Sequence, residues 1–137
     1  NRCTTNNQNW HISDHANHKL SATLKVNSYP HTVTPKVVVG QVHGYEIKQA
    51  LVKLVWEGSN KPVRALLNDR FLPDNKKCSN CHTFSVELGK VKAGEDWSYQ
   101  IEVNKQGIFL QAAGKTKDIR WGDKVDGKTL SKDWANN

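Results

Sequence analysis

A glutamine and a histidine stand two positions apart in the valine-rich stretch 38–44. In a β-strand, alternate side chains point to opposite faces, so we expect Gln41 and His43 on one face and Val38 and Val42 on the other. An amide beside an imidazole can hydrogen-bond a developing negative charge, and a histidine can also transfer a proton near neutral pH. The spacing leaves open a second interpretation, in which the pair makes buried structural hydrogen bonds.

Two cations follow on the next expected strands. Lys53 and Arg64 each alternate with apolar neighbours, which places them on the polar face of their strand. Both could pair with the carboxylates of an acidic ligand, and arginine could do so through two hydrogen bonds. The alternative is that they are exposed strand cations that discourage edge-to-edge aggregation.

A compact cysteine motif occupies residues 78–82, with the sequence Cys-Ser-Asn-Cys-His. It matches the haem-attachment pattern, but the chain has no methionine to serve as the usual second axial ligand. A zinc site would need further ligands, which His82 and Cys3 could supply, but a second cysteine pair is lacking. The simplest prediction is a small disulfide between Cys78 and Cys81, which leaves the partner of Cys3 open.

Histidines also cluster near the N-terminus, at His11, His15 and His18, with Asp14 between them. The spacing of His11 and His15 would suit a metal on one face of a helix, but the asparagine-rich surroundings favour a loop. We therefore treat the cluster as a chance accumulation and expect neither a metal nor any other cofactor.

Length and charge limit the possible functions. The 137 residues suffice for one domain, residues 1–137, and no apolar stretch is long enough to span a membrane. Twenty Lys and Arg against thirteen Asp and Glu give a formal charge of +7, which favours a polyanionic partner. The basic residues are scattered, with Lys76-Lys77 as the only doublet, so a nucleic-acid-binding tail is not expected.

The element pattern has a period of two almost throughout. We expect strands at residues 18–26, 36–43, 51–56, 63–67, 83–88, 97–103, 108–112 and 116–121, and no closing strand in the polar segment 122–137. A turn signal, Asn-Lys-Gln-Gly, separates the sixth from the seventh. About eight strands joined by turns predict an all-β fold, an antiparallel sandwich or jelly roll.

The motif Gly-Gln-Val-His after a run of valines, followed by Leu-Val-Lys-Leu at residues 51–54, resembles the alginate lyases of polysaccharide lyase family 7. Trp10 with the alternating stretch 18–26, and the later stretch Trp-Ser-Tyr-Gln-Ile-Glu-Val at 97–103, resemble the family segments on either side. The similarity runs from about Trp10 to Trp121. It implies a jelly roll whose concave sheet forms the substrate groove, with Gln41 and His43 catalytic and Arg2 binding substrate. From their place on the polar strand faces, we expect Lys53 and Arg64 to bind substrate as well.

Two family motifs are not found whole in this sequence. Of the Arg-x-Glu-Leu-Arg strand, only Arg2 is a candidate, as its final arginine. The Tyr-Phe-Lys-Ala-Gly strand, whose tyrosine the resemblance implies is the proton donor, has no counterpart. We therefore expect a partial jelly-roll domain that is completed by a complementary segment of the same protein.

The resemblance implies β-elimination on alginate or a close polyuronate, in a secreted or periplasmic protein, without a cofactor and with no nucleic-acid or membrane partner. One rival interpretation is a non-catalytic module in which the same residues bind acidic glycan without cleaving it. Another is a basic β-barrel for single-stranded nucleic acid. That barrel would need exposed aromatics interleaved with cations, whereas Phe84, Trp97 and Tyr99 lie on the same face as the apolar residues of their strands.

Overall fold

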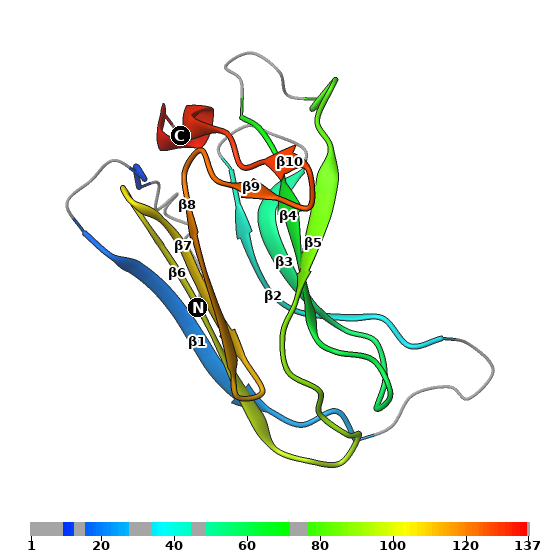
Figure 1. Cartoon of the computed structure of the whole chain (residues 1–137). Helices are drawn as coiled ribbons and strands as arrows, with labels where there is room; N and C mark the ends of the chain where they lie inside the picture. The colour runs from blue at the N-terminus through cyan, green and yellow to red at the C-terminus, as the bar shows by residue number, and fades with distance from the viewer. Residues whose placement is uncertain (1–9, 13–15, 28–33, 45–48, 72–76, 137) are drawn as a thin grey trace, which may run out of the picture.

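A computed structural model of the chain describes residues 10–12, 16–27, 34–44, 49–71 and 77–136. Nearly half of them form two four-stranded antiparallel sheets that pack as a sandwich (Figure 1). Sheet A holds, in spatial order, β1 (His18–Leu24), β6 (Trp97–Asn104), β7 (Gly107–Ala112) and β8 (Lys115–Arg120). Sheet B holds β2 (Val37–His43), β3 (Ala50–Trp56), β4 (Arg64–Asn68) and β5 (Thr83–Glu87).

The all-β prediction is confirmed, and each of the eight expected strands lies within two residues of its predicted bounds. The topology is consistent with a jelly roll. The prediction for residues 122–137 is wrong, because β9 (Lys124–Val125) and β10 (Lys128–Thr129) form a small hairpin there, followed by the 3₁₀ helix η1 (Lys132–Asn136). Asp126 and Gly127 both have positive φ, 50° and 77°, as a tight two-residue hairpin turn requires.

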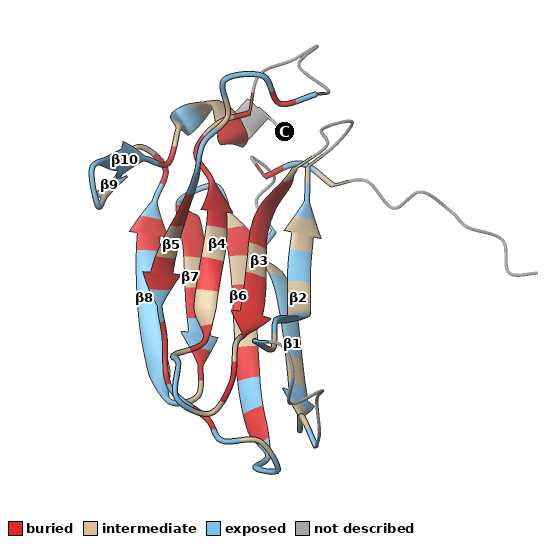
Figure 2. Ribbon diagram, turned by 90° about the vertical axis from the view of Figure 1, so that its right-hand side faces the viewer, coloured by how far each residue is buried: buried red, intermediate tan, exposed pale blue. Residues whose placement is uncertain are grey.

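The core lies between the sheets, where the alternating apolar residues of both inner faces meet (Figure 2). On β3, Val52, Leu54 and Trp56 are fully buried, and on β6 the alternate residues Ile101 and Val103 face them from the other sheet. Each fully buried side chain of this size contributes on the order of 2 kcal/mol through apolar burial. The core is therefore a sufficient reason for the strict alternation seen in the sequence.

Within the described residues, no further strand covers one margin of the sandwich, which we call the open margin. β1 is an edge strand of sheet A and β2 is an edge strand of sheet B, and both lie on the same side of the molecule (Figure 2). The exposed large hydrophobic residues of the described chain, Leu20, Val37 and Val38, all belong to these two strands. Edge strands normally carry charges or are covered, so apolar residues exposed at this margin stand out.

No helix in the described part of the chain has the length and apolar character needed to cross a membrane.

Candidate active site

Strand β2 carries the glutamine and the histidine, and its pairing with β3 is interrupted twice, between Val38 and Gly40 and between Val42 and His43. The first interruption makes part of our face assignment wrong. Val38 is 48% exposed, and Val39 instead packs against the core, because a β-bulge reverses the alternation on one side of it. A bulge beside a candidate site also turns the strand and changes the direction of the side chains that follow.

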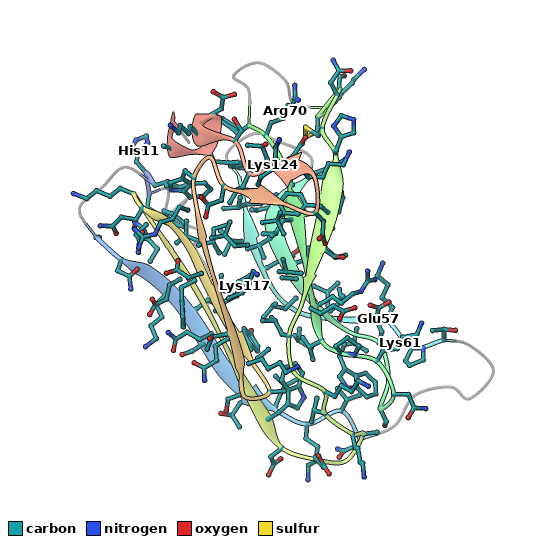
Figure 3. All side chains as sticks on the ribbon, viewed as in Figure 1. His11, Glu57, Lys61, Arg70, Lys117 and Lys124 are labelled. Carbon is teal, nitrogen blue, oxygen red and sulfur yellow. A yellow bond between two sulfur atoms is a disulfide. The ribbon has the colours of Figure 1, made fainter. Side chains whose placement is uncertain are left out.

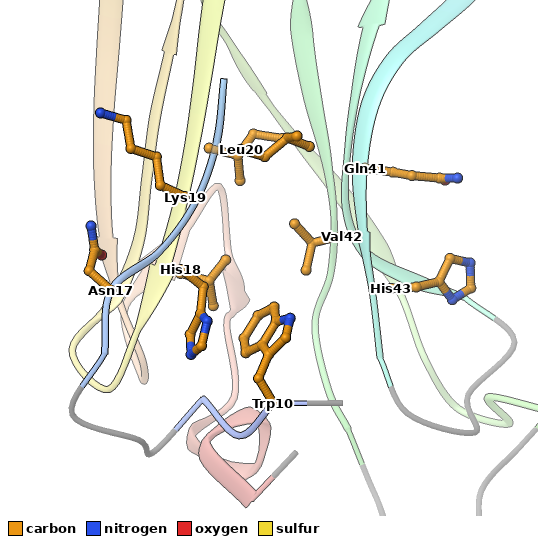
Figure 4. A pocket seen from close by; sticks show the side chains of 10 residues that line it. Trp10, Asn17, His18, Lys19, Leu20, Gln41, Val42 and His43 are labelled. Carbon is orange, nitrogen blue, oxygen red and sulfur yellow. The ribbon is translucent and has the colours of Figure 1, made fainter. Parts of the chain in front are cut away.

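Beyond this bulge, the predicted alternation holds. Gln41 and His43 are both exposed and point away from the interior, whereas Val42 points inward toward Trp10 (Figure 4). The interpretation of the pair as a buried hydrogen-bonding couple is therefore wrong. The amide and the imidazole are exposed on the outer side of an edge strand, where a large ligand can reach them.

Lys53 lies directly across from Gln41 in the pairing of β2 with β3. Residues directly opposite each other in an antiparallel pair have Cβ atoms about 5 Å apart, so the lysine chain and the amide are neighbours on one face. Lys53 is half-buried and makes no ion pair with a described residue. The outer face of sheet B thus offers an uncompensated cation next to a neutral hydrogen-bonding group.

Arg64 also lies on this face, where it is held by a carboxylate of its own chain. Its Nε donates to Glu57 Oε1 at 2.6 Å, and its Nη1 lies 3.5 Å from the Ser85 hydroxyl. This hydrogen bond lowers the pKa of Glu57 and raises the pKa of Arg64. The guanidinium of Arg64 is therefore already paired with a carboxylate, which makes it a weaker site for substrate carboxylates than the ammonium of Lys53.

Tyr99 reaches the inner side of the same strand from sheet A. Its hydroxyl donates to the Val39 carbonyl oxygen at 2.8 Å, and burial raises the pKa of this phenol. A Cβ at Gly40 would lie 2.6 Å from the Tyr99 hydroxyl oxygen, so the glycine leaves the space that the ring needs. Tyr99 is 5% exposed, which confirms its prediction as a core residue.

A cavity of about 470 Å³ lies at the open margin, between β1 and β2 (Figure 4). Trp10 and His18 stack in it, with ring centroids 3.8 Å apart, and the apolar side chains of Leu20 and Val42 line it as well. The Nε2 atom of His18 is buried and has no hydrogen-bond partner among the described residues. The sequence pattern did not indicate this stacked pair, because it joins a loop residue to the first residue of a strand.

The prediction of a disulfide between Cys78 and Cys81 is confirmed. Asn68 at the end of β4 donates from Nδ2 to Cys78 Sγ at 3.2 Å, so the bridge is anchored to sheet B. Within the described residues, no group of three or more His, Cys, Asp or Glu is placed to hold a metal ion. Arg2, His15 and Asp14 lie outside the described residues, as does Tyr45.

Comparison with known families gives one match. The sequence model of the family described as alginate lyase covers residues 1–137, the whole of this chain. No curated protein matches the chain.

Proposed function

The chain belongs to the alginate lyase family, and we propose that it cleaves alginate by β-elimination on the outer face of sheet B. The observation that carries this proposal is the arrangement of three side chains. Gln41 and His43 point outward together from β2, and Lys53 lies across from Gln41 on β3. Family membership supports lyase chemistry on alginate, and the arrangement supports this face as the place for it.

β-Elimination removes the C5 proton of a uronate and expels the glycosidic oxygen at C4. The proton becomes acidic enough only if the charge that develops on the adjacent carboxylate is stabilised. In our proposal, the Gln41 amide and the Lys53 ammonium hydrogen-bond that carboxylate, and His43 accepts the proton or adds a further hydrogen bond. Arg64 contributes less, because Glu57 already holds its guanidinium. Arg2 remains a predicted contributor.

The leaving oxygen needs a proton donor, which the resemblance to family 7 gives to a tyrosine. Tyr99 is a poor candidate because its hydroxyl is bound to Val39 on the inner side of the strand. We propose that a complementary segment of the protein supplies the tyrosine by pairing with the free edge of β2. The exposed Val37 and Val38 support an additional element at this margin, as does the Nε2 of His18, which has no partner among the described residues.

We propose an exported protein, secreted or periplasmic. The Cys78–Cys81 disulfide supports this location, since disulfides persist mainly in oxidising compartments.

A glycan-binding module without catalysis is the second candidate. It is favoured by one observation: the described tyrosine, Tyr99, does not face Gln41 and His43. In that case the same outer face would bind acidic polysaccharide and leave it intact.

The experiment that separates the two candidates follows the ultraviolet absorbance of 4,5-unsaturated chain ends on alginate. The chain is assayed alone and with a millimolar excess of a peptide that carries Tyr-Phe-Lys-Ala-Gly. The matched control peptide carries Phe-Phe-Lys-Ala-Gly. We expect product with the tyrosine peptide and much less with the phenylalanine peptide.

Two results would count against parts of the proposal. Full activity of the chain alone would remove the need for a complementary segment. Alginate binding without product under every condition would favour the non-catalytic module. Alginate binding and cleavage are then measured for a Gln41→Ala variant and for a Ser85→Ala control on the same face. A loss of either property in Gln41→Ala but not in Ser85→Ala would show that the surface around Gln41 is used for it.

A further inference from the structure

A second polar cavity lies at the end of sheet B, away from β2. It measures about 680 Å³ and is formed where the disulfide loop meets the β9–β10 hairpin and the start of η1. We call it the Asp69 pocket, after the residue at its base. The charged side chains that line it are Asp69, Arg70, Lys128, Lys132 and Asp133, and the imidazole of His82 lines it as well.

Asp69 is fixed in place by several hydrogen bonds. It is 7% exposed, and among the described residues only Asn68 shares its status as a buried polar side chain. Its carboxylate accepts from the backbone N–H of His82 at 2.7 Å and lies 3.2 Å from His82 Nδ1. Its backbone carbonyl accepts from the N–H of Ser131 at 2.7 Å. The base of the pocket is therefore preorganised by three separate segments of the chain.

The contact between His82 and Asp69 also orients the imidazole. With Nδ1 directed at the carboxylate, Nε2 is the ring atom left for another partner, and the side chain is 54% exposed. Arg70 Nε lies 3.8 Å from the same carboxylate. The buried carboxylate of Asp69 thus contacts a histidine and an arginine, and both of these side chains are exposed to solvent.

The rim of the pocket carries two further cations. Lys128 and Lys132 are exposed and make no ion pair with a described residue. The stem of Lys132 lies over Gly122, where a Cβ would come within 2.8 Å of Lys132 Cε. Gly122 also has a φ of 97°, which a side chain would disfavour. The position of the Lys132 ammonium therefore depends on the absence of a side chain at residue 122.

We propose that the Asp69 pocket binds the carboxylate of an acidic sugar. Arg70 is paired with Asp69, whereas Lys128 and Lys132 make no ion pair with a described residue, so the rim offers two cations against the one remaining carboxylate, Asp133. Its volume is in the range of small-ligand sites. Its lining is mostly polar, unlike that of pockets for apolar cofactors.

The choice of a uronate among anions rests on the proposed lyase function. Strands in a sheet lie about 4.8 Å apart, and three strand spacings separate β5, next to the pocket, from β2. The pocket is therefore a carboxylate site separate from Gln41 and His43, about three strand spacings away across sheet B. One extended polyuronate could reach both sites.

The test is a ¹⁵N–¹H NMR titration of the 137-residue chain with sodium D-glucuronate, with D-glucose and sodium acetate as parallel probes. We expect glucuronate to shift the amides of Gly122, Gly127 and Thr129 with a dissociation constant in the range of about 1–10 mM. Glucose should leave them unchanged, and acetate should bind at least several-fold more weakly. Absence of these shifts at about 50 mM glucuronate, or equal binding of acetate, would overturn the proposal.

The variant is the double substitution Lys128→Gln and Lys132→Gln. The matched control is the double substitution Lys115→Gln and Lys117→Gln on β8, which removes the same two charges. Both lysines are exposed and outside the pocket, and Lys117 lies away from Arg70 (Figure 3). We expect the pocket variant to weaken glucuronate binding at least tenfold, the loss for one or two charged hydrogen bonds, and the control to change it less than twofold. An equal loss in the control would mean that net charge alone attracts glucuronate, contrary to the proposal.

This titration involves no catalysis, so its outcome is independent of the lyase assay. Binding of glucuronate without any cleavage of alginate would contradict the proposed function and leave the pocket standing. Cleavage of alginate without these amide shifts would do the reverse.

Discussion

The hydroxyl of Tyr99 donates a 2.8 Å hydrogen bond to the carbonyl oxygen of Val39, which joins the two sheets at the strand that carries Gln41 and His43. Gly40, the next residue, leaves room for the ring. A core tyrosine thereby supports the outward-facing pair from behind, although it does not contact the pair's outer face.

The first prediction concerns this contact. Gly40→Ala would place a methyl group 2.6 Å from the Tyr99 hydroxyl oxygen, so β2 or the ring must move. Overpacking of this kind lowers the free energy of unfolding by about 1–3 kcal/mol, measurable by urea denaturation. In a Tyr99→Ala background the same substitution should cost much less. An equal cost in both backgrounds would show that the contact does not explain the glycine.

The second prediction is a dependence of stability on acid pH through Glu57. Hydrogen bonding to Arg64 lowers the pKa of Glu57 in the folded chain below its ordinary value of 4.5. The unfolded chain therefore binds the proton first as pH falls, and the stabilisation that is full above about pH 4.5 is lost below it. Because Arg64 is partly exposed, we expect a contribution of no more than about 1 kcal/mol.

The measurement for this pair compares the free energy of unfolding of the wild type and of Glu57→Gln at pH 6 and at pH 3. The difference between the two proteins should shrink toward acid pH. Glu95→Gln, an exposed carboxylate outside this pair, is the matched control, and a difference that stays constant with pH would contradict the assignment.

The third prediction concerns the disulfide. Cys78 and Cys81 close a very short loop, and the chain-entropy estimate for a loop of this length is about 2 kcal/mol. Cys78→Ser with Cys81→Ser should lower the free energy of unfolding by about that amount. Ser79→Ala, within the same loop, controls for local changes of polarity. A loss similar to that of the control would mean that the bridge constrains the unfolded chain little.

The fourth prediction separates catalysis from binding on the outer face of sheet B. In an active preparation, Gln41→Ala should lower kcat by about 10²–10³, since the amide stabilises charge that develops in the transition state. Lys53→Gln should raise KM and also lower kcat. Arg64→Gln should change both parameters less, because its cation is already paired with Glu57. A larger effect at Arg64 than at Lys53 would reverse our ranking of the two cations.

Much of this architecture could be predicted because strands buried on one face must alternate. Trp97, Tyr99, Ile101 and Val103 show that alternation in the sequence, and all four are buried. The bulge between Val38 and Gly40 could not be predicted, since it depends on how β2 pairs with β3. The β9–β10 hairpin has a local signal in the sequence, Asp126-Gly127, which is typical of a tight hairpin turn.

Part of the candidate site could also be predicted from the sequence, and part of it could not. The shared face of Gln41 and His43 follows from strand geometry alone, and so does the polar face of Lys53. The pairing of Arg64 with Glu57 does not, because it requires the register of β3 against β4. The stacking of Trp10 on His18 and the Asp69 pocket likewise depend on segments that only the folded chain brings together.

The exposed apolar residues at the open margin have a consequence for handling the protein. Leu20, Val37 and Val38 are apolar residues exposed on two edge strands, and the formal charge of +7 keeps copies of the chain apart. At about 1 M ionic strength the screening length falls to about 3 Å, so this repulsion disappears while the apolar residues remain exposed. Colloidal stability of the chain should therefore decrease as salt is added, the opposite of simple salting-in.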